Sequence, residues 1–522
     1  MNAETLTKKI KAAILSILLV LGGGHFVYAQ NHTVQLQQTR QMIENGDFSL
    51  AGSRLRSIIS CENVTPTDRW EAEFQLDLMN RIKKDFYRTQ ESVLEDLKEY
   101  FPNITAEDLQ KWESTGALEC KTIDGKKCYF HSAVRNLFRI DEQAGKVRED
   151  IKGRQSDDLD IYLSEFLPKV VEATYNTDSI YVLPQQVKYT YTIRVKPNEI
   201  PEGETIRVWM PYPRSNNRQR NIKLLSTSQP DYIISPDKYD HKSLYMEGTA
   251  VKDSAITFSY SATYTSYNEF HRFNPLTDVK PYDTTSAIYK KYTAERKTHV
   301  IFTDDIKRIT DSIVGNESNP YFKAVKIFDY IAKTYPWASA REYSTLYNIP
   351  QYVINNHHGD CGQVTLLFVT MARYAGIPAK WESGWMLHPG DLNLHDWGAA
   401  YFEGIGWVPV DQSFGLTKRE YYEAKLYPAK GKKKGKKNTL TEQENDVYHF
   451  FTKGIDCYRF IVNDDYSGEF YPAKTYPRSE TVDFQRGEVE WRGENLYFGR
   501  WRYNMEVEVT PLEGNLLKNA YS

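Results

Sequence analysis

The chain has 522 residues, too long for one hydrophobic core, and this length predicts roughly three or four domains. Its composition, 40% hydrophobic and 26% charged, is that of a folded protein rather than a disordered one. The formal net charge at pH 7 is only -3, so no overall field favours nucleic acid or an anionic membrane as a partner.

Residues 1–29 have the pattern of a signal peptide. Three lysines by position 11 precede an uncharged apolar run over 12–21, and Val27-Tyr28-Ala29 offers a cleavage site. The run is shorter than the roughly 20 residues that cross a bilayer, although an uncleaved anchor is the alternative. No later segment is apolar enough to span a membrane. We therefore expect an exported protein, periplasmic, cell-surface or secreted, with no integral membrane segment after signal removal.

Residues 30–178 are predicted to be mainly helical, with one β-hairpin. A stripe of apolar side chains at four-residue steps predicts a helix between Thr67 and Phe86. The stripe consists of Trp70, Phe74, Leu78 and Ile82. The role of this region stays open between a scaffold and a cover over the catalytic site.

The predicted hairpin is flanked by two cysteines, Cys120 and Cys128. A three-residue loop with Gly125 in the left-handed conformation would place them opposite each other, as a disulfide requires. A two-residue loop of Asp124 and Gly125 would offset them by one position, onto opposite faces. The sequence leaves both alternatives open.

Two further regions are predicted to be rich in strands. Residues 179–275 contain several short alternating segments separated by turn residues, which is typical of a β-sandwich. Residues 438–522 form a C-terminal β-rich region. They follow a lysine-rich segment, 430–437, that is predicted to be a solvated linker.

The chemistry is expected within 285–430, where helical and strand patterns alternate. Cys361 precedes an apolar helical segment whose N-terminus Asp360 can cap. Unpaired N–H groups at a helix start favour the thiolate, the nucleophilic form of cysteine. The chain has five cysteines, and an odd cysteine in an exported protein is a candidate reactive thiol. A buried structural cysteine is the alternative.

A histidine and a carboxylate occur in the hairpin that should follow. His395 and Asp411 are each eight residues from Glu403, in the middle of the connection, so an antiparallel pairing would bring them together. The carboxylate would then accept the Nδ1 proton of His395 and direct Nε2 toward the thiol.

These motifs resemble the core of the transglutaminase-like superfamily. The matching segments are Gly359-Asp-Cys361, Gly376-Ile-Pro-Ala379, His395-Asp-Trp397 and Gly406-Trp-Val-Pro-Val-Asp411. The resemblance implies a papain-like architecture with Cys361 as nucleophile, His395 as general base and Asp411 as the residue that orients it. The chain departs from animal-type transglutaminases at Gly362, where those enzymes typically have tryptophan.

The other histidines and tryptophans do not form a pattern typical of a second functional site. His357, His358 and Cys361 lack the acid or thiol cluster that would complete a metal site, and no nucleotide-binding fingerprint occurs. We therefore expect no metal and no cofactor. His388 is predicted to be a loop histidine. Three tryptophans, Trp381, Trp385 and Trp397, are predicted to line the core or the cleft.

The sequence as a whole predicts an α+β multidomain protein. A papain/transglutaminase-like catalytic core is flanked by an N-terminal helical region and β-rich domains. The expected activity is that of a cysteine-dependent amide-bond hydrolase, a peptidase or amidase acting through a thioester. Its substrate would be a protein, peptide or peptidoglycan-type amide. The alternatives are a protein-glutamine acyltransferase and a non-catalytic surface binding protein on the same core.

Overall fold

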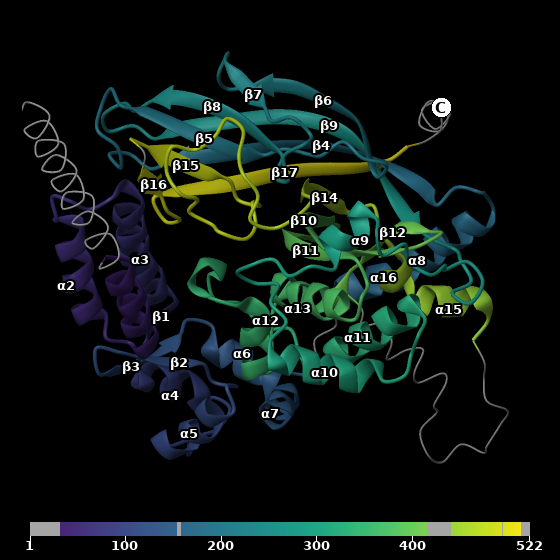
Figure 1. Cartoon of the computed structure of the whole chain (residues 1–522), viewed down its shortest axis with the longest axis horizontal. Helices are drawn as coiled ribbons and strands as arrows, with labels where there is room; N and C mark the ends of the chain where they lie inside the picture. Colours follow the sequence, from purple (N-terminus) through teal and green to yellow (C-terminus); the bar gives the residue numbers. More distant parts are fainter. Residues whose placement is uncertain (1–31, 154–157, 415–439, 493, 513–522) are drawn as a thin grey trace, which may run out of the picture. The chain divides into compact units, whose positions relative to one another are not determined.

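The computed structural model describes residues 32–153, 158–414, 440–492 and 494–512 (Figure 1). They form a mixed helix and sheet protein of several parts, which confirms the predicted fold class. The chain divides into two compact units between Leu137 and Phe138. The predicted signal peptide and the lysine-rich linker lie outside the described residues. No helix in the described part is long and apolar enough to cross a membrane.

The first unit combines helices with a small sheet. It is helical over residues 32–45. Its further helices are α2 (Phe48–Ile59), α3 (Pro66–Asp85), α4 (Gln90–Lys98) and α5 (Ala106–Ser114), and α6 (Ala133–Ile140) spans the division. Thr65 caps α3, which matches the predicted helix. The buried face coincides with the predicted stripe only in part, because Ile82 is buried but Trp70 is 40% exposed, and Ala72, Gln75 and Met79 are buried instead.

The hairpin in this unit shows whether Cys120 and Cys128 lie opposite each other, as a disulfide requires. Strands β1 (Phe86–Arg88), β2 (Cys120–Ile123) and β3 (Lys126–Phe130) form a sheet of order β1-β3-β2. Asp124 and Gly125 both have positive φ, and Lys121 rather than Cys120 pairs with Cys128. The two-residue loop is therefore confirmed and the disulfide alternative is wrong. All five cysteines are free, so the odd-cysteine argument no longer singles out Cys361.

The second unit contains two sheets packed face to face. One has the order β13-β9-β4-β17, with β6 also paired to β9, and the other has the order β16-β15-β5-β8-β7. The strands are β4 (Tyr181–Val195), β5 (Thr205–Pro211), β6 (Gln219–Thr227), β7 (Tyr232–Ile234), β8 (Ser243–Thr249), β9 (Ile256–Phe270), β13 (Gly454–Ile455), β15 (Glu488–Trp491), β16 (Glu494–Leu496) and β17 (Trp501–Pro511). Alternate side chains of both sheets, among them Tyr191, Val208 and Tyr260, form one buried cluster.

Strands from the C-terminal region 438–522 are distributed over three sheets. β17 pairs with β4, β15 pairs with β5, and β14 (Arg459–Asn463) pairs with β10 of the catalytic core. Figure 1 shows the yellow strands β15 and β17 lying beside the teal strands of the two sheets. The C-terminal region therefore completes the sandwich and also contributes a strand beside the predicted site.

The core sheet has the order β12-β11-β10-β14. Its other strands are β10 (Ala379–His388), β11 (Asp391–Phe402) and β12 (Gly406–Val410). Helix α13 (Cys361–Tyr374) packs on one face, where Leu366 and Val369 share a buried cluster with Trp381 and Ala400. The helix ends as predicted, with Gly376 at φ +80° just beyond it.

Further helices surround α13 and the core sheet (Figure 1). They are α7 (Glu142–Lys152), α8 (Asp158–Tyr175), α9 (Ala287–Tyr292), α10 (Asp304–Val314), α11 (Pro320–Thr334), α12 (Ile349–Asn356), α15 (Glu442–Tyr448) and α16 (Phe450–Lys453), with short 3-10 turns η1 (Tyr343–Thr345) and η2 (Gln412–Phe414). Leu163 and Leu167 of α8 belong to the same buried cluster as α13. This part of the predicted helical region therefore packs into the second unit.

Candidate functional site

Cys361 is the first residue of α13, as the sequence predicts. The Asp360 carboxylate accepts a hydrogen bond from the backbone N–H of Gln363 at 3.0 Å. In return, Gln363 Oε1 accepts one from the backbone N–H of Asp360 at 3.3 Å, which completes a capping box. Gln363 is fully buried and its Oε1 atom is used in the cap, whereas its Nε2 atom has no hydrogen-bond partner among the described residues.

The thiol of Cys361 contacts Asp396 on β11. Cys361 Sγ donates to Asp396 Oδ2 at 3.5 Å, and the backbone of Asp396 also hydrogen-bonds to the sulfur. Asp396 is held from its other side by Gln485, whose Nε2 donates to Oδ1 at 2.7 Å. Tyr343 Oη donates to Asp360 at 2.6 Å and lies 3.5 Å from Asp396 Oδ2. Asp396 is therefore the hydrogen-bond partner of the sulfur among the described residues.

The space around this contact explains the glycine at position 362. A Cβ there would lie 2.2 Å from Tyr343 Oη, 2.7 Å from Asp396 Oδ2 and 2.8 Å from the ring of Trp381. Atoms without a bond between them do not approach so closely. The site therefore has no room for the tryptophan that animal-type transglutaminases typically carry at this point.

His395 and Asp411 are brought together, as the sequence predicts. His395 Nε2 lies 2.8 Å from Asp411 Oδ2, and both side chains are buried. The pairs Gly398↔Val410 and Phe402↔Gly406 centre the hairpin on Gly404, one residue later than predicted. Asp411 is consequently in line with Trp397 rather than His395. The two side chains still meet because residues two apart on a strand share a face.

The predicted assignment of the ring nitrogens is wrong. Asp411 binds Nε2 of His395, so the nitrogen left for other partners is Nδ1. Trp397 lies beside the imidazole, with ring centroids 5.8 Å apart.

Asp411 has a second partner that sequence reasoning missed. Arg459 of β14 donates from Nη2 to the same Oδ2 atom at 2.8 Å. Its guanidinium also donates from Nη1 to Asp456 at 3.1 Å and lies 4.4 Å from the ring centroid of Phe414. An arginine amid the apolar side chains of 459–463 was the available signal, since buried charges are usually paired. The pairing joins residues 48 positions apart, which no local pattern indicates.

Neighbouring residues of β11 point to opposite faces of the sheet. Asp396 faces α13 and the thiol, whereas His395 faces Trp397, Asp411 and Arg459. The structure therefore joins two of the three predicted catalytic residues directly. The third, Cys361, contacts the residue next to His395.

Electrostatics differ on the two faces. Burial raises the pKa of Asp411, but His395 and Arg459 outweigh it and hold that pKa below its usual value. Burial, Asp396 and Asp360 raise the pKa of the Cys361 thiol well above normal. The predicted thiolate at the helix start is therefore not favoured here, because burial and two carboxylates outweigh the helix dipole.

The carboxyl groups around the thiol are themselves perturbed. Burial, Asp483 and Asp360 raise the pKa of Asp396 well above normal. Burial also raises the pKa of Asp360 to about 6 and that of Asp483 to about 7. This cluster binds protons in a range where an ordinary aspartate is fully ionised.

The remaining histidines have structural contacts. His388 is the last residue of β10 and is buried, so the loop prediction is wrong. Its Nε2 lies 3.2 Å from Asp456 and 3.1 Å from Arg459. His357 is an exposed left-handed helix cap, and His358 is buried with Nδ1 2.8 Å from the Asn356 carbonyl. Among the described residues, no group of three histidine, cysteine or acidic side chains could hold a metal ion.

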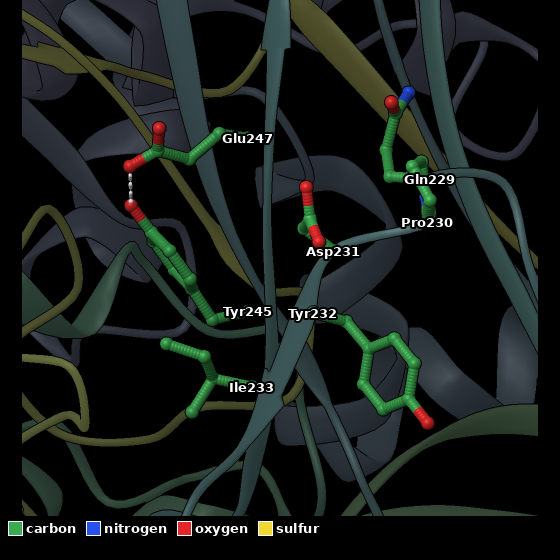
Figure 2. A pocket seen from close by; sticks show the side chains of 7 residues that line it. All are labelled: Gln229, Pro230, Asp231, Tyr232, Ile233, Tyr245 and Glu247. Atoms are coloured by element: carbon green, nitrogen blue, oxygen red, sulfur yellow. Dashed lines mark hydrogen bonds between the residues drawn. The ribbon is translucent and has the colours of Figure 1, made fainter.

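A surface hollow of about 610 Å³ lies elsewhere, on strands β7 and β8 (Figure 2). Tyr232, Ile233 and Tyr245 line it, and Tyr245 donates a hydrogen bond to Glu247. The lining offers neither a thiol nor an imidazole, so the candidate chemistry stays with Cys361 and His395.

Comparison with known proteins points to the same segment. The family model described as the transglutaminase-like superfamily matches residues 307–412. An uncharacterized protein of Haemophilus influenzae is 25% identical over 275 residues, which are 46% of this chain and 70% of that protein.

Two solved structures are also similar to this chain. One is a candidate cysteine protease from Cytophaga hutchinsonii, with a TM-score of 0.40 and 14% identity over 64% of this chain and 93% of that one. The other is the periplasmic domain of TgpA from Pseudomonas aeruginosa, with a TM-score of 0.23 and 12% identity over 49% and 93%. Residues 307–412, which contain Cys361, His395 and Asp411, are thus a core domain of the transglutaminase-like superfamily.

Proposed function

We propose that this chain is a cysteine-dependent amide-bond hydrolase, a peptidase or amidase, with Cys361 as nucleophile, His395 as general base and Asp411 as the orienting residue. The observation that carries the proposal is the buried pair of His395 Nε2 and Asp411 Oδ2 at 2.8 Å. His395 is adjacent in sequence to Asp396, which contacts the Cys361 thiol at the start of α13. A binding protein would have no need of this arrangement.

The reaction proceeds by acyl transfer. The Cys361 proton passes to His395, the sulfur attacks the amide carbonyl, and a carbon–sulfur bond forms. The backbone N–H of Cys361 at the helix start stabilises the resulting oxyanion. The carbon–nitrogen bond then breaks, and the amine leaves with the proton from His395. Water finally attacks the thioester and gives its proton to His395, which returns it to the departing sulfur.

The proposed substrate is a protein, peptide or peptidoglycan-type amide. Trp337, 45% exposed, supports an extended substrate because its backbone pairs with Gly359, two residues before Cys361. The Arg139 guanidinium lies 4.4 Å from the centroid of this ring, so a substrate would contact the part of the ring that Arg139 leaves exposed. We place the enzyme outside the cytoplasm on the basis of the predicted signal peptide.

The decisive experiment compares the wild-type protein with the Cys361→Ala variant on a complex peptide mixture. The reaction is run under reducing conditions with a primary amine present. Mass spectrometry then scores new termini, deamidation and amine adducts together. We expect new termini or deamidated amides that depend on Cys361.

The Cys128→Ala variant is the matched control, because Cys128 is also a free, partly exposed thiol but lies in the β2–β3 hairpin. It should behave as wild type. Amine adducts without hydrolysis would establish an acyltransferase instead. Identical products from wild type and Cys361→Ala on all substrates would leave the binding-protein alternative.

A further inference from the structure

Asp396 is a residue of the site to which the proposed triad gives no role. Its Oδ2 atom accepts the Cys361 thiol hydrogen bond at 3.5 Å, and the residue is 2% exposed. A hydrogen bond from its backbone to the sulfur acts in the other direction and lowers the thiol pKa. It is the nearest ionisable partner that the structure gives to the nucleophilic atom. A group in this position must influence the reactivity of the sulfur.

The position of Asp396 is built into the fold. Gln485 Nε2 donates to Asp396 Oδ1 at 2.7 Å and to the His395 carbonyl at 2.9 Å, so one amide fixes the carboxylate relative to β11. Tyr343 Oη closes the site from η1. Gly362 has no Cβ, and any Cβ would lie 2.7 Å from Asp396 Oδ2. The carboxylate therefore has a single well-defined place against the sulfur.

We infer that Asp396 restrains the nucleophile, holding the Cys361 thiol neutral and directed away from His395 until substrate displaces this contact. The inference rests on the proposed role of Cys361. A carboxyl oxygen that accepts from S–H stabilises the neutral thiol, because this hydrogen bond is lost when the sulfur is deprotonated. The side chain of His395 lies on the other face of β11, so a thiol that is hydrogen-bonded to Asp396 is not hydrogen-bonded to the base.

Other charged groups face the same place and set the charge of Asp396. Asp360 lies at the start of α13, and Asp483 and Arg486 come from the segment before β15. Arg486 Nη1 lies 3.6 Å from Glu342 Oε2, which gives this cationic group a carboxylate of its own. Burial, Asp483 and Asp360 together favour the protonated, neutral form of Asp396.

The test measures the reactivity of Cys361 without requiring catalysis. The rate of alkylation by iodoacetamide is followed against pH, and mass spectrometry reads the peptide that contains Cys361. In the Asp396→Ala variant the rate at neutral pH should rise about tenfold or more, since the neutral thiol loses the hydrogen-bond acceptor that stabilises it and its pKa should fall by about one unit or more. An unchanged or slower rate would overturn the inference.

The matched control is Asp483→Asn, which removes a nearby carboxylate that faces Asp396. This variant should not accelerate alkylation, because Asp396 remains on the sulfur. Equal acceleration in both variants would show that general charge, not the Asp396 contact, sets the reactivity, and this too would overturn the inference.

A measurement on the wild-type protein avoids any dependence on how the variant folds. The S–H infrared band of Cys361, identified by its loss in Cys361→Ala, should be present at neutral pH and shifted as a hydrogen-bonded thiol. Absence of the band would mean a thiolate already exists and would contradict the inference. Amide cleavage by the wild type is scored separately, so failure of the proposed function and failure of the restraint are distinguishable.

Discussion

The two faces of β11 place buried carboxylates in opposite electrostatic surroundings. On one face Asp411 contacts His395 and the guanidinium of Arg459, and its pKa is lowered. On the other face Asp396 is surrounded by Cys361, Asp360 and Asp483, and its pKa is raised. Burial is similar on both faces, so the difference comes from the countercharge. One face maintains an ionised carboxylate for the base, and the other binds protons near the nucleophile.

The largest expected effect comes from removing the ionised carboxylate. Asp411→Ala should lower kcat/KM by about 10³-fold or more, because His395 loses the partner that fixes its orientation. Peptide cleavage under saturating and limiting substrate measures kcat and KM separately. Asp464→Ala is the control, since Asp464 directly follows β14, pairs with Lys380 and has no contact with His395 or Asp411 among the described interactions. Retention of full activity by Asp411→Ala would remove Asp411 from the mechanism.

The Arg459→Met variant tests whether the cation of Arg459 stabilises the ionised form of the buried Asp411 carboxyl group. Removing the cation leaves Asp411 and Asp456 buried with fewer partners, which should lower the free energy of unfolding by about 3–5 kcal/mol. The pKa of Asp411 should rise, so the acidic limb of the activity profile should move to higher pH. Urea unfolding and the pH dependence of kcat/KM measure the two effects.

The control for this variant is Arg500→Met. Arg500 pairs with Glu199 at 2.8 Å but is 39% exposed, so its loss should cost less than about 1 kcal/mol. Equal losses in both variants would mean that the buried network contributes no more than a surface ion pair.

Local sequence signals predicted the elements of the site well. The N-terminal cap at Asp360, the apolar face of α13 and the meeting of His395 with Asp411 all follow from short-range patterns. The register was misplaced by one residue because the turn glycines, Gly404 and Gly406, allow more than one centre.

The parts that escaped prediction depend on distant pairings. Arg459 reaches Asp411 only because β14 pairs with β10, and Gln485 reaches Asp396 from a segment 89 residues later. Asp396 itself stands beside His395 in the sequence, but its contact with the sulfur depends on how α13 crosses the sheet. Charge at a site is thus set by tertiary neighbours that spacing along the chain does not reveal.

Gly362→Ala tests how tightly the Asp396 face is packed. The added Cβ would lie 2.2 Å from Tyr343 Oη, so the site must shift, at an expected cost of about 1–3 kcal/mol in the free energy of unfolding. Gly52→Ala is the control on another helix, α2, where the Cβ meets the flexible end of Arg56 at 3.3 Å. That variant should be neutral or more stable, since alanine favours helix. No loss in Gly362→Ala would mean that the space beside the thiol is open.

The smallest expected effect is a dependence of stability on pH that comes from the Asp396 face alone. The pKa of Asp360 is raised to about 6 and that of Asp483 to about 7, so both groups bind protons more tightly in the folded chain than in the unfolded chain. The stabilisation of the fold by protons bound to these two groups is fully present below their unfolded pKa, and it is lost as pH rises through their folded pKa. Unfolding free energy should therefore rise by on the order of 1 kcal/mol from about pH 8 to about pH 5.5.

Asp411 does not contribute to the change in unfolding free energy between these pH values, because its lowered pKa affects stability only in more acidic solution. Asp483→Asn should shrink the rise by removing one titrating carboxyl group, whereas the exposed Asp304→Asn should leave it unchanged. Thermal unfolding of the three proteins at both pH values gives the comparison. If Asp483→Asn keeps the full dependence, the protons are bound elsewhere and the contrast between the two faces of β11 would not hold.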